Sequence, residues 1–160
     1  MNTVTAKIAY PIRALLGEGS YWDLDNQRLL WVDILGHKIY VFDPKTQSNS
    51  GYDLGQDIGT LVMTESGLWA YADRDGIGIY NPRTGQKIHG AKPEEHNDHI
   101  RFNDGKCDAR GTFWVGTMAY SCEQGAGTLY EFDGKGEVKT KIKNTTISNG
   151  LVWNDKSTKF

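Results

Sequence analysis

Four polar residues of the sequence have types and spacing that suit the binding of a metal ion and a substrate. Glu18, Asn103 and Asn149 each carry a side-chain oxygen, and hard divalent cations such as Ca²⁺ and Mg²⁺ prefer carboxylate and amide oxygens. Arg101 lies two residues before Asn103, so both side chains can project from the same side of an extended segment. A guanidinium there can hydrogen-bond a polyhydroxylated or anionic ligand. The three oxygen donors can act together only if the fold brings these distant positions to one place.

A recurring pair of strands predicts the elements that could bring them together. Each unit has a strand with a Trp, then a strand with a central Tyr, then an Asp/Asn-Pro or Asp-Gly turn. The units are RLLWVD with HKIYVFDPKTQ (28–47), GLWAYA with GIGIYNPRTGQ (67–86) and GTFWVGT with GTLYEFDGKG (111–136). A repeat of about 40 to 50 residues built from short strands is typical of a propeller blade. The alternative is an all-β sandwich with coincidental Trp-Tyr hairpins, and the matching order of three units favours the propeller.

The same repeat predicts where the innermost strand of each blade begins. Upstream of the Trp strands the corresponding positions are Glu18-Gly19-Ser20, Ile58-Gly59-Thr60, Asn103-Asp104-Gly105 and, in a fourth unit, Asn149-Gly150-Leu151. The innermost strands of a propeller surround a central channel, so these starts would meet at one mouth of it. Glycines after Glu18 and Asn149 would let the backbone approach closely. Although a lone Asn-Gly pair is also a common turn, we expect Glu18, Asn103 and Asn149 to converge as metal ligands.

The predicted fold is therefore all-β, a partial propeller of about three blades and the start of a fourth. We expect the blades at about 15–54, 58–90 and 101–143, with an incomplete fourth blade at 147–160. In that fourth blade Leu151-Val152-Trp153 is expected to form the innermost strand, and Phe160 to lie within the second strand.

Composition and motifs narrow the function further. The chain has 18 basic and 20 acidic side chains, a net charge of −2, so no field for nucleic acid or membrane binding is expected. Cys107 and Cys122 lack the spacing of a metal site and are expected as reduced thiols of a cytoplasmic protein. No Gly-x-Ser-x-Gly elbow and no phosphate-binding glycine loop is present. Oxygen ligands without a nucleophile favour metal-assisted activation of a carbonyl or of water.

Three segments of the sequence carry a resemblance to a known family. GEGSYWD (17–23), RFNDGKCDARGTFWVGTM (101–118) and ISNGLVW (147–153) resemble the senescence marker protein-30, gluconolactonase and luciferin-regenerating enzyme family, also called regucalcin-like. The resemblance extends from about residue 15 to residue 160. It implies a six-bladed β-propeller with a divalent metal ion at its centre, and the hydrolysis of a lactone as the usual activity.

Individual residues match the functional positions of that family. Glu18 matches its metal-binding Glu, and Asn149 matches the Asn of its Ser-Asn-Gly motif. Arg101 and Asn103 match an Arg-x-Asn-Asp-Gly motif whose side chains contact the substrate or lie beside the metal. The resemblance thus implies one divalent ion, with Ca²⁺ expected first and Zn²⁺, Mg²⁺ or Mn²⁺ as alternatives. The implied partner is a small sugar lactone, which opens to an aldonic acid when the metal polarises its carbonyl and water attacks.

The sequence departs from the family pattern at two points. Many relatives have an acidic residue shortly after the Gly-Thr-Met motif, where this chain has Tyr120 and Ser121. The resemblance therefore does not imply which sugar is preferred. The metal-binding and catalytic Asp of the family is expected beyond Phe160, so no catalytic residue can be named here and impaired activity is expected. The alternatives are a non-catalytic half-propeller that binds a sugar or a protein, or an inactive fragment. Exposed blade flanks would favour self-association.

Overall fold

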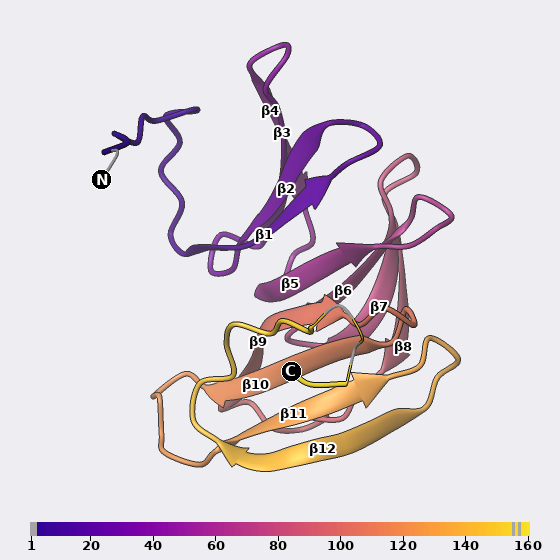
Figure 1. Cartoon of the computed structure of the whole chain (residues 1–160). Coiled ribbons are helices and arrows are strands. Elements are labelled where there is room, and N and C mark those ends of the chain that lie inside the picture. The colour runs from indigo at the N-terminus through magenta and orange to yellow at the C-terminus, as the bar shows by residue number, and fades with distance from the viewer. Residues whose placement is uncertain (1–2, 155, 157) are drawn as a thin grey trace.

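The computed structural model describes residues 3–154, 156 and 158–160, and the regular structure in them is β-strand. The strands form three four-stranded antiparallel sheets, each made of strands that follow one another in the sequence (Figure 1). The first sheet contains β1 (Gly17–Asp23), β2 (Arg28–Asp33), β3 (Lys38–Asp43) and β4 (Ser48–Asp53). The second contains β5 (Ile58–Met63), β6 (Trp69–Asp73), β7 (Gly76–Asn81) and β8 (Gln86–Ala91). The third contains β9 (Ile100–Cys107), β10 (Phe113–Ala119), β11 (Gly127–Phe132) and β12 (Val138–Thr145). The predicted all-β class is confirmed.

No helix long and apolar enough to cross a membrane occurs in the described part of the chain.

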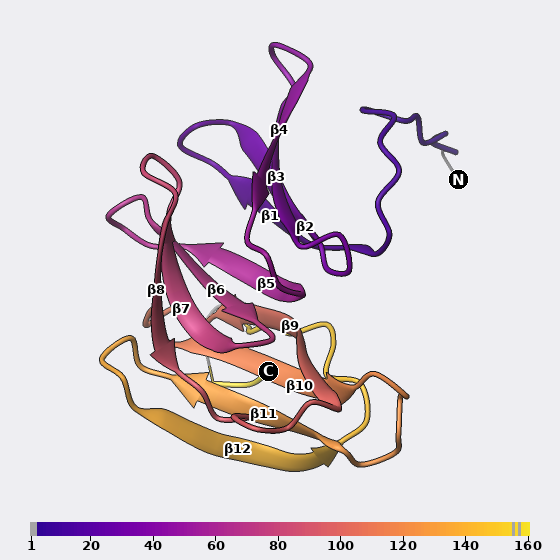
Figure 2. The same cartoon turned by 180° about the vertical axis from the view of Figure 1, so that it is seen from behind.

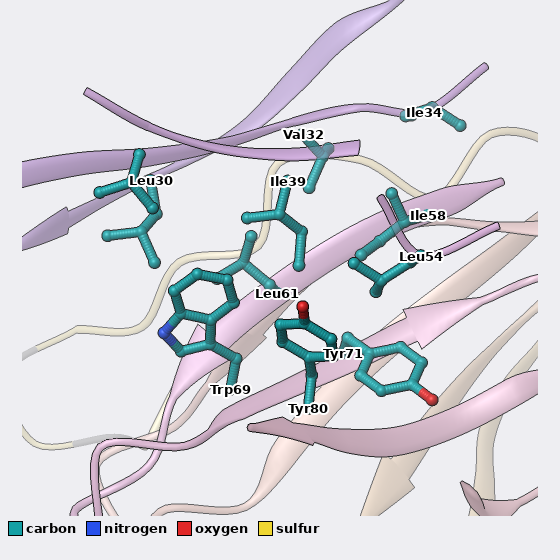
Figure 3. Close-up of a cluster of buried hydrophobic side chains, with 11 residues drawn as sticks. Leu30, Val32, Ile34, Ile39, Leu54, Ile58, Leu61, Trp69, Tyr71 and Tyr80 are labelled. Atoms are coloured by element: carbon teal, nitrogen blue, oxygen red, sulfur yellow. The ribbon is translucent and has the colours of Figure 1, made fainter. Parts of the chain in front are cut away.

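Alternating apolar residues decide which face of the first sheet is buried. Successive side chains of a strand point to opposite faces of its sheet. Leu30 of β2 and Ile39 of β3 are fully buried, and they pack with Leu61 and Trp69 of the second sheet in one apolar cluster (Figure 3). Trp31, between buried neighbours in β2, therefore lies on the opposite face, where its ring stacks on Tyr40 with centroids 4.4 Å apart.

A second apolar cluster joins the second and third sheets. Ala72 and Ile77 of the second sheet pack there with Phe113, Val115 and other residues of the third. The middle sheet therefore has both faces covered, which explains why β6 is buried along its whole length. Each of the outer two sheets contributes only one face to these clusters.

The turn after each Tyr strand is held in the same way. The side-chain oxygens of Asp43, Asn81 and Asp133 each accept a hydrogen bond from the backbone N–H two residues later, at 2.8 to 2.9 Å. Such local bonds are the reason that Asp and Asn favour turns. The recurrence of one turn in three sheets supports the repeat seen in the sequence.

The first strands of the three sheets lie next to one another (Figures 1 and 2). β5 lies between β1 and β9, and its approach to β9 is close. A Cβ added to Gly59 would lie 2.5 Å from the backbone oxygen of Asn103, a separation that real Cβ atoms do not reach. Glycine at position 59 is therefore what allows the inner strands of the second and third sheets to meet.

The segment that follows the third sheet differs from the prediction. Leu151-Val152-Trp153 was expected to be an inner strand, but none of these three residues is in a strand. The segment touches the third sheet through an isolated bridge between Ile147 and Met118. Trp153 and Phe160 then pack on Trp114 of β10, with ring centroids 6.0 and 5.2 Å from it. A strand requires a neighbour for its hydrogen bonds, and the described residues after 153 supply none.

Candidate metal and substrate site

Contacts between inner strands bring the sequence-predicted residues to one region. Gly19 of β1 faces Gly59 of β5, since a Cβ added to Gly19 would lie 3.5 Å from the Gly59 carbonyl oxygen. Gly59 in turn adjoins Asn103 of β9. This row of contacts between inner strands continues into the segment after β12, because Asn103 Nδ2 donates a hydrogen bond to the Ser148 carbonyl oxygen at 2.8 Å. Glu18, Asn103 and Asn149 each lie within this row or directly beside it.

Arg101 and Asn103 form the buried part of the site. They are 8% and 6% exposed, and Arg101 Nη1 donates hydrogen bonds to Asn103 Oδ1 at 2.7 Å and to the Phe102 carbonyl at 3.0 Å. The two side chains therefore lie on the same side of β9, as a spacing of two residues predicts. Burial lowers the pKa of Arg101, and nearby acidic groups, which include Asp57 and Glu18, oppose that effect.

The turn that carries Asn149 is held by Asp104. Asp104 Oδ2 accepts a hydrogen bond from the Gly150 N–H at 2.8 Å, and Oδ1 accepts one from the Gly105 N–H at 2.8 Å. The reason for glycine at 150 differs from the predicted one. A Cβ there would meet open space, but the φ of 72° lies in the left-handed region that favours glycine. Gly150 thus serves the turn and not a close approach.

The donor set of Glu18, Asn103 and Asn149 fits a hard divalent cation. The Glu18 carboxylate and the Asn149 amide are exposed, and Asn103 Oδ1 keeps one lone pair after it accepts from Arg101. Oxygen donors of this kind suit Ca²⁺ or Mg²⁺. The described residues include no group of three or more His, Cys, Asp and Glu side chains that could hold a metal ion. A cation bound here would thus combine the carboxylate with amide oxygens.

Sequence reasoning missed a group of three polar side chains near Arg101. His37 Nε2 lies 2.8 Å from Asp57 Oδ1, with the Asp57 side chain 14% exposed. The Tyr120 hydroxyl donates a short hydrogen bond to Asp57 Oδ2. The only sequence signal for Asp57 is its place directly before the inner-strand triplet Ile58-Gly59-Thr60. Asp57 is therefore a further carboxylate besides Glu18 and Asp104, with one oxygen facing His37 and the other bonded to Tyr120.

Comparison with known proteins places this chain in a family. Residues 16–160 match the SMP-30/Gluconolactonase/LRE-like region. The chain belongs to this family, as the motifs of the sequence predicted. Among curated relatives, the 6-deoxy-6-sulfogluconolactonase of Pseudomonas putida is 30% identical over 142 residues, which are 88% of this chain and 48% of that protein. The family includes gluconolactonases and other lactonases.

Solved structures of the family have the same fold. The calcium-binding protein regucalcin of Agrobacterium tumefaciens is 27% identical, with a TM-score of 0.79 over 84% of this chain and 45% of that one. A luciferin-regenerating enzyme is 26% identical, with a TM-score of 0.82 over 89% of this chain and 50% of that one. The three sheets are therefore blades of a β-propeller of this family. The chain spans about half the length of the curated relatives that it matches.

Proposed function

We propose that the chain provides part of the active site of a metal-dependent hydrolase that opens a sugar lactone to its aldonic acid. The observation that supports the proposal is the row of contacts from Gly19 through Gly59 and Asn103 to Ser148, because it brings the strands and the turn that carry the predicted ligands next to one another. The names of relatives support the substrate class, since one is a 6-deoxy-6-sulfogluconolactonase and another is a pentonolactonase.

Some residues of this chain would bind the cation, and another would bind the substrate. Glu18, Asn149 and Asn103 would hold one divalent ion, most simply Ca²⁺, as in the regucalcin described as calcium-binding. When bound, such an ion supplies Lewis-acid polarisation of a carbonyl oxygen. Arg101, fixed by its bonds to Asn103 Oδ1 and the Phe102 carbonyl, would orient the hydroxyls of the sugar. Orientation of this kind lowers the entropic part of the barrier.

The proposal extends to the activity of residues 1–160 by themselves. Glu18 is the one carboxylate among the three proposed ligands, and Asp57 is engaged by His37 and Tyr120. Affinity for Ca²⁺ increases with the number of charged ligands. We therefore expect these 160 residues to bind the ion weakly and to hydrolyse lactones slowly.

Hydrolysis of D-glucono-δ-lactone, followed through acid release, tests the proposal. We expect turnover that a chelator abolishes and added Ca²⁺ restores, and a loss of at least tenfold in the Glu18→Gln variant. Glu65→Gln is a matched control, because Glu65 is an exposed residue in the turn at the other end of β5. Turnover that survives chelation, or that both variants retain, would contradict a metal-dependent site at Glu18. Binding of the sugar without turnover would favour a binding module instead.

A further inference from the structure

Three side chains outside the proposed metal ligands meet near Arg101, and each lies next to a different sheet. His37 lies in the turn between β2 and β3, Asp57 directly precedes β5, and Tyr120 directly follows β10. His37 Nε2 lies 2.8 Å from Asp57 Oδ1, and the Tyr120 hydroxyl donates to Asp57 Oδ2. Asp57 is thus the common partner that links the first, second and third sheets at this end of the fold.

The bond to Asp57 fixes what the Tyr120 hydroxyl can offer a ligand. An ionised carboxylate can only accept hydrogen bonds, so the Tyr120 proton is directed toward Asp57 and the lone pairs of the hydroxyl oxygen remain free. Burial and the Asp57 carboxylate both raise the pKa of Tyr120, and the charges of Arg74 and Arg101 lower it only in part. The hydroxyl therefore stays protonated at neutral pH and acts as an uncharged acceptor.

Tyr120 is also accessible from a cavity at the end of β10. The side chain is 41% exposed, and it lines an open cavity of about 440 Å³ together with Asp98, His99, Ser121 and Glu123. A cavity of this volume is within the range of small-molecule sites. His99 precedes Arg101 by two residues, and its carbonyl oxygen accepts a hydrogen bond from the Tyr120 N–H at 3.0 Å. The backbone thus couples the position of Tyr120 to the strand that carries Arg101.

We propose that Tyr120 determines specificity in this site, because its hydroxyl oxygen accepts a hydrogen bond from one hydroxyl of the lactone. Asp57, bridged to His37, is a positioning residue that holds the Tyr120 hydroxyl in the acceptor orientation. An uncharged acceptor favours a neutral, hydroxylated lactone over one that lacks the hydroxyl. This inference rests on the proposed function, since it assigns one contact within the same site.

Kinetics on two lactones test the role of Tyr120. We expect Tyr120→Phe to raise KM for D-glucono-δ-lactone about tenfold with kcat nearly unchanged, since one hydrogen bond corresponds to about that factor. KM for δ-valerolactone, which has no ring hydroxyls, should not change. Tyr40→Phe is a matched control, because Tyr40 stacks on Trp31 on the outer face of the first sheet. Equal effects on the two lactones, or no effect on either, would overturn the inference.

A double-mutant cycle tests the positioning role of Asp57. Asp57→Asn should raise KM for D-glucono-δ-lactone in the same direction but by a smaller factor. In the Tyr120→Phe background the same change should add little, because residues that act as a unit are non-additive. Additive effects of the two changes on KM would show that Asp57 acts independently of Tyr120 and would contradict its positioning role. Thermal unfolding of each variant measures its effect on stability separately.

A binding measurement separates this inference from the proposed hydrolysis. 1,5-Anhydro-D-glucitol is a cyclic polyol that cannot be hydrolysed, and its binding in the presence of Ca²⁺ can be followed by NMR. We expect Tyr120→Phe to weaken its Kd about tenfold relative to wild type and to Tyr40→Phe. If wild type binds the polyol without turning over the lactone, the hydrolase proposal fails and the role of Tyr120 stands. A wild-type chain that does not bind the polyol overturns the inference.

Discussion

At the scale of single residues, Asp104 is the side chain that positions a proposed ligand without being one. It bonds the Gly150 N–H and the Gly105 N–H, both at 2.8 Å. We predict that Asp104→Ala loosens the Asn149 turn and weakens Ca²⁺ binding three- to tenfold, about 1 kcal/mol for a hydrogen bond. Calorimetric titration with Ca²⁺ measures this. Asp133→Ala removes a similar bond to a backbone N–H in a remote turn and should leave affinity unchanged; equal losses in both would refute the positioning role.

Asp23 predicts how stability responds to acid. Burial alone would raise the pKa of Asp23, but hydrogen bonds from Arg28 and Asn26 outweigh burial and hold that pKa below its ordinary value. A carboxyl with a depressed folded pKa stabilises the fold above its unfolded pKa of about 4, and this stability is lost as pH falls through the folded pKa. We predict that Asp23→Asn is less stable than the wild type at pH 7 and that its free energy of unfolding falls less on acidification. Urea unfolding of the two proteins at pH 7 and at pH 3 measures these free energies. An equal fall in both proteins would contradict a depressed pKa of Asp23 as the cause.

Residue types and the repeat register together indicated the candidate ligands, and they could not indicate Asp57 and Tyr120. The recurrence of an inner-strand start at matching positions predicts Glu18, Asn103 and Asn149, and the structure places the strands and the turn that carry them next to one another. The bond between Tyr120 and Asp57 joins positions 63 residues apart on different sheets. It depends on how the ends of two blades approach each other, which no local pattern records. Ligand roles for the three gathered residues remain predictions.

At the scale of elements, the packing of β5 against β9 should control both stability and the site. A Cβ on Gly59 would lie 2.5 Å from the Asn103 oxygen and 2.6 Å from the Phe102 oxygen. We predict that Gly59→Ala destabilises the chain by about 2 to 4 kcal/mol, because overpacking displaces the strand, and that it also weakens Ca²⁺ binding. Chemical denaturation and calorimetry measure the two effects. Gly17→Ala is the control, since its Cβ would make an ordinary 3.5 Å contact with Ala14; equal stability of the two variants would rule out the tight approach.

Hairpins were predictable at this scale, and the final segment was not. Period-two burial and Asp or Asn turns are local properties, so the strands with Trp and Tyr could be identified from their own residues. Leu151-Val152-Trp153 has the composition of a strand, but a strand forms only where a second strand accepts its hydrogen bonds. In the structure Trp153 packs on Trp114 instead. Tertiary contacts therefore decided the conformation of this segment.

At the scale of the whole molecule, the outer face of the first sheet is an aromatic surface. Trp22 pairs with Leu29 across β1 and β2, and Trp31 pairs with Tyr40 across β2 and β3, so all four side chains share the face opposite the core. Trp22 is 45% exposed. Blades of a propeller normally pack face to face, and an exposed apolar patch of this kind favours association.

We predict that the chain self-associates through this aromatic face. Light scattering after gel filtration at about 50 µM should give a mass above the 17.9 kDa of one chain, and dilution should lower it by mass action. Trp22→Glu places a charge in the contact, whose burial without a partner is unfavourable, and should give a monomer. Leu24→Glu alters a residue that is 72% exposed in the adjacent turn and should leave association intact. If Trp22→Glu associates as strongly as the wild type, the contact lies on another surface. A monomeric wild type at this concentration would show that the aromatic face alone does not drive assembly.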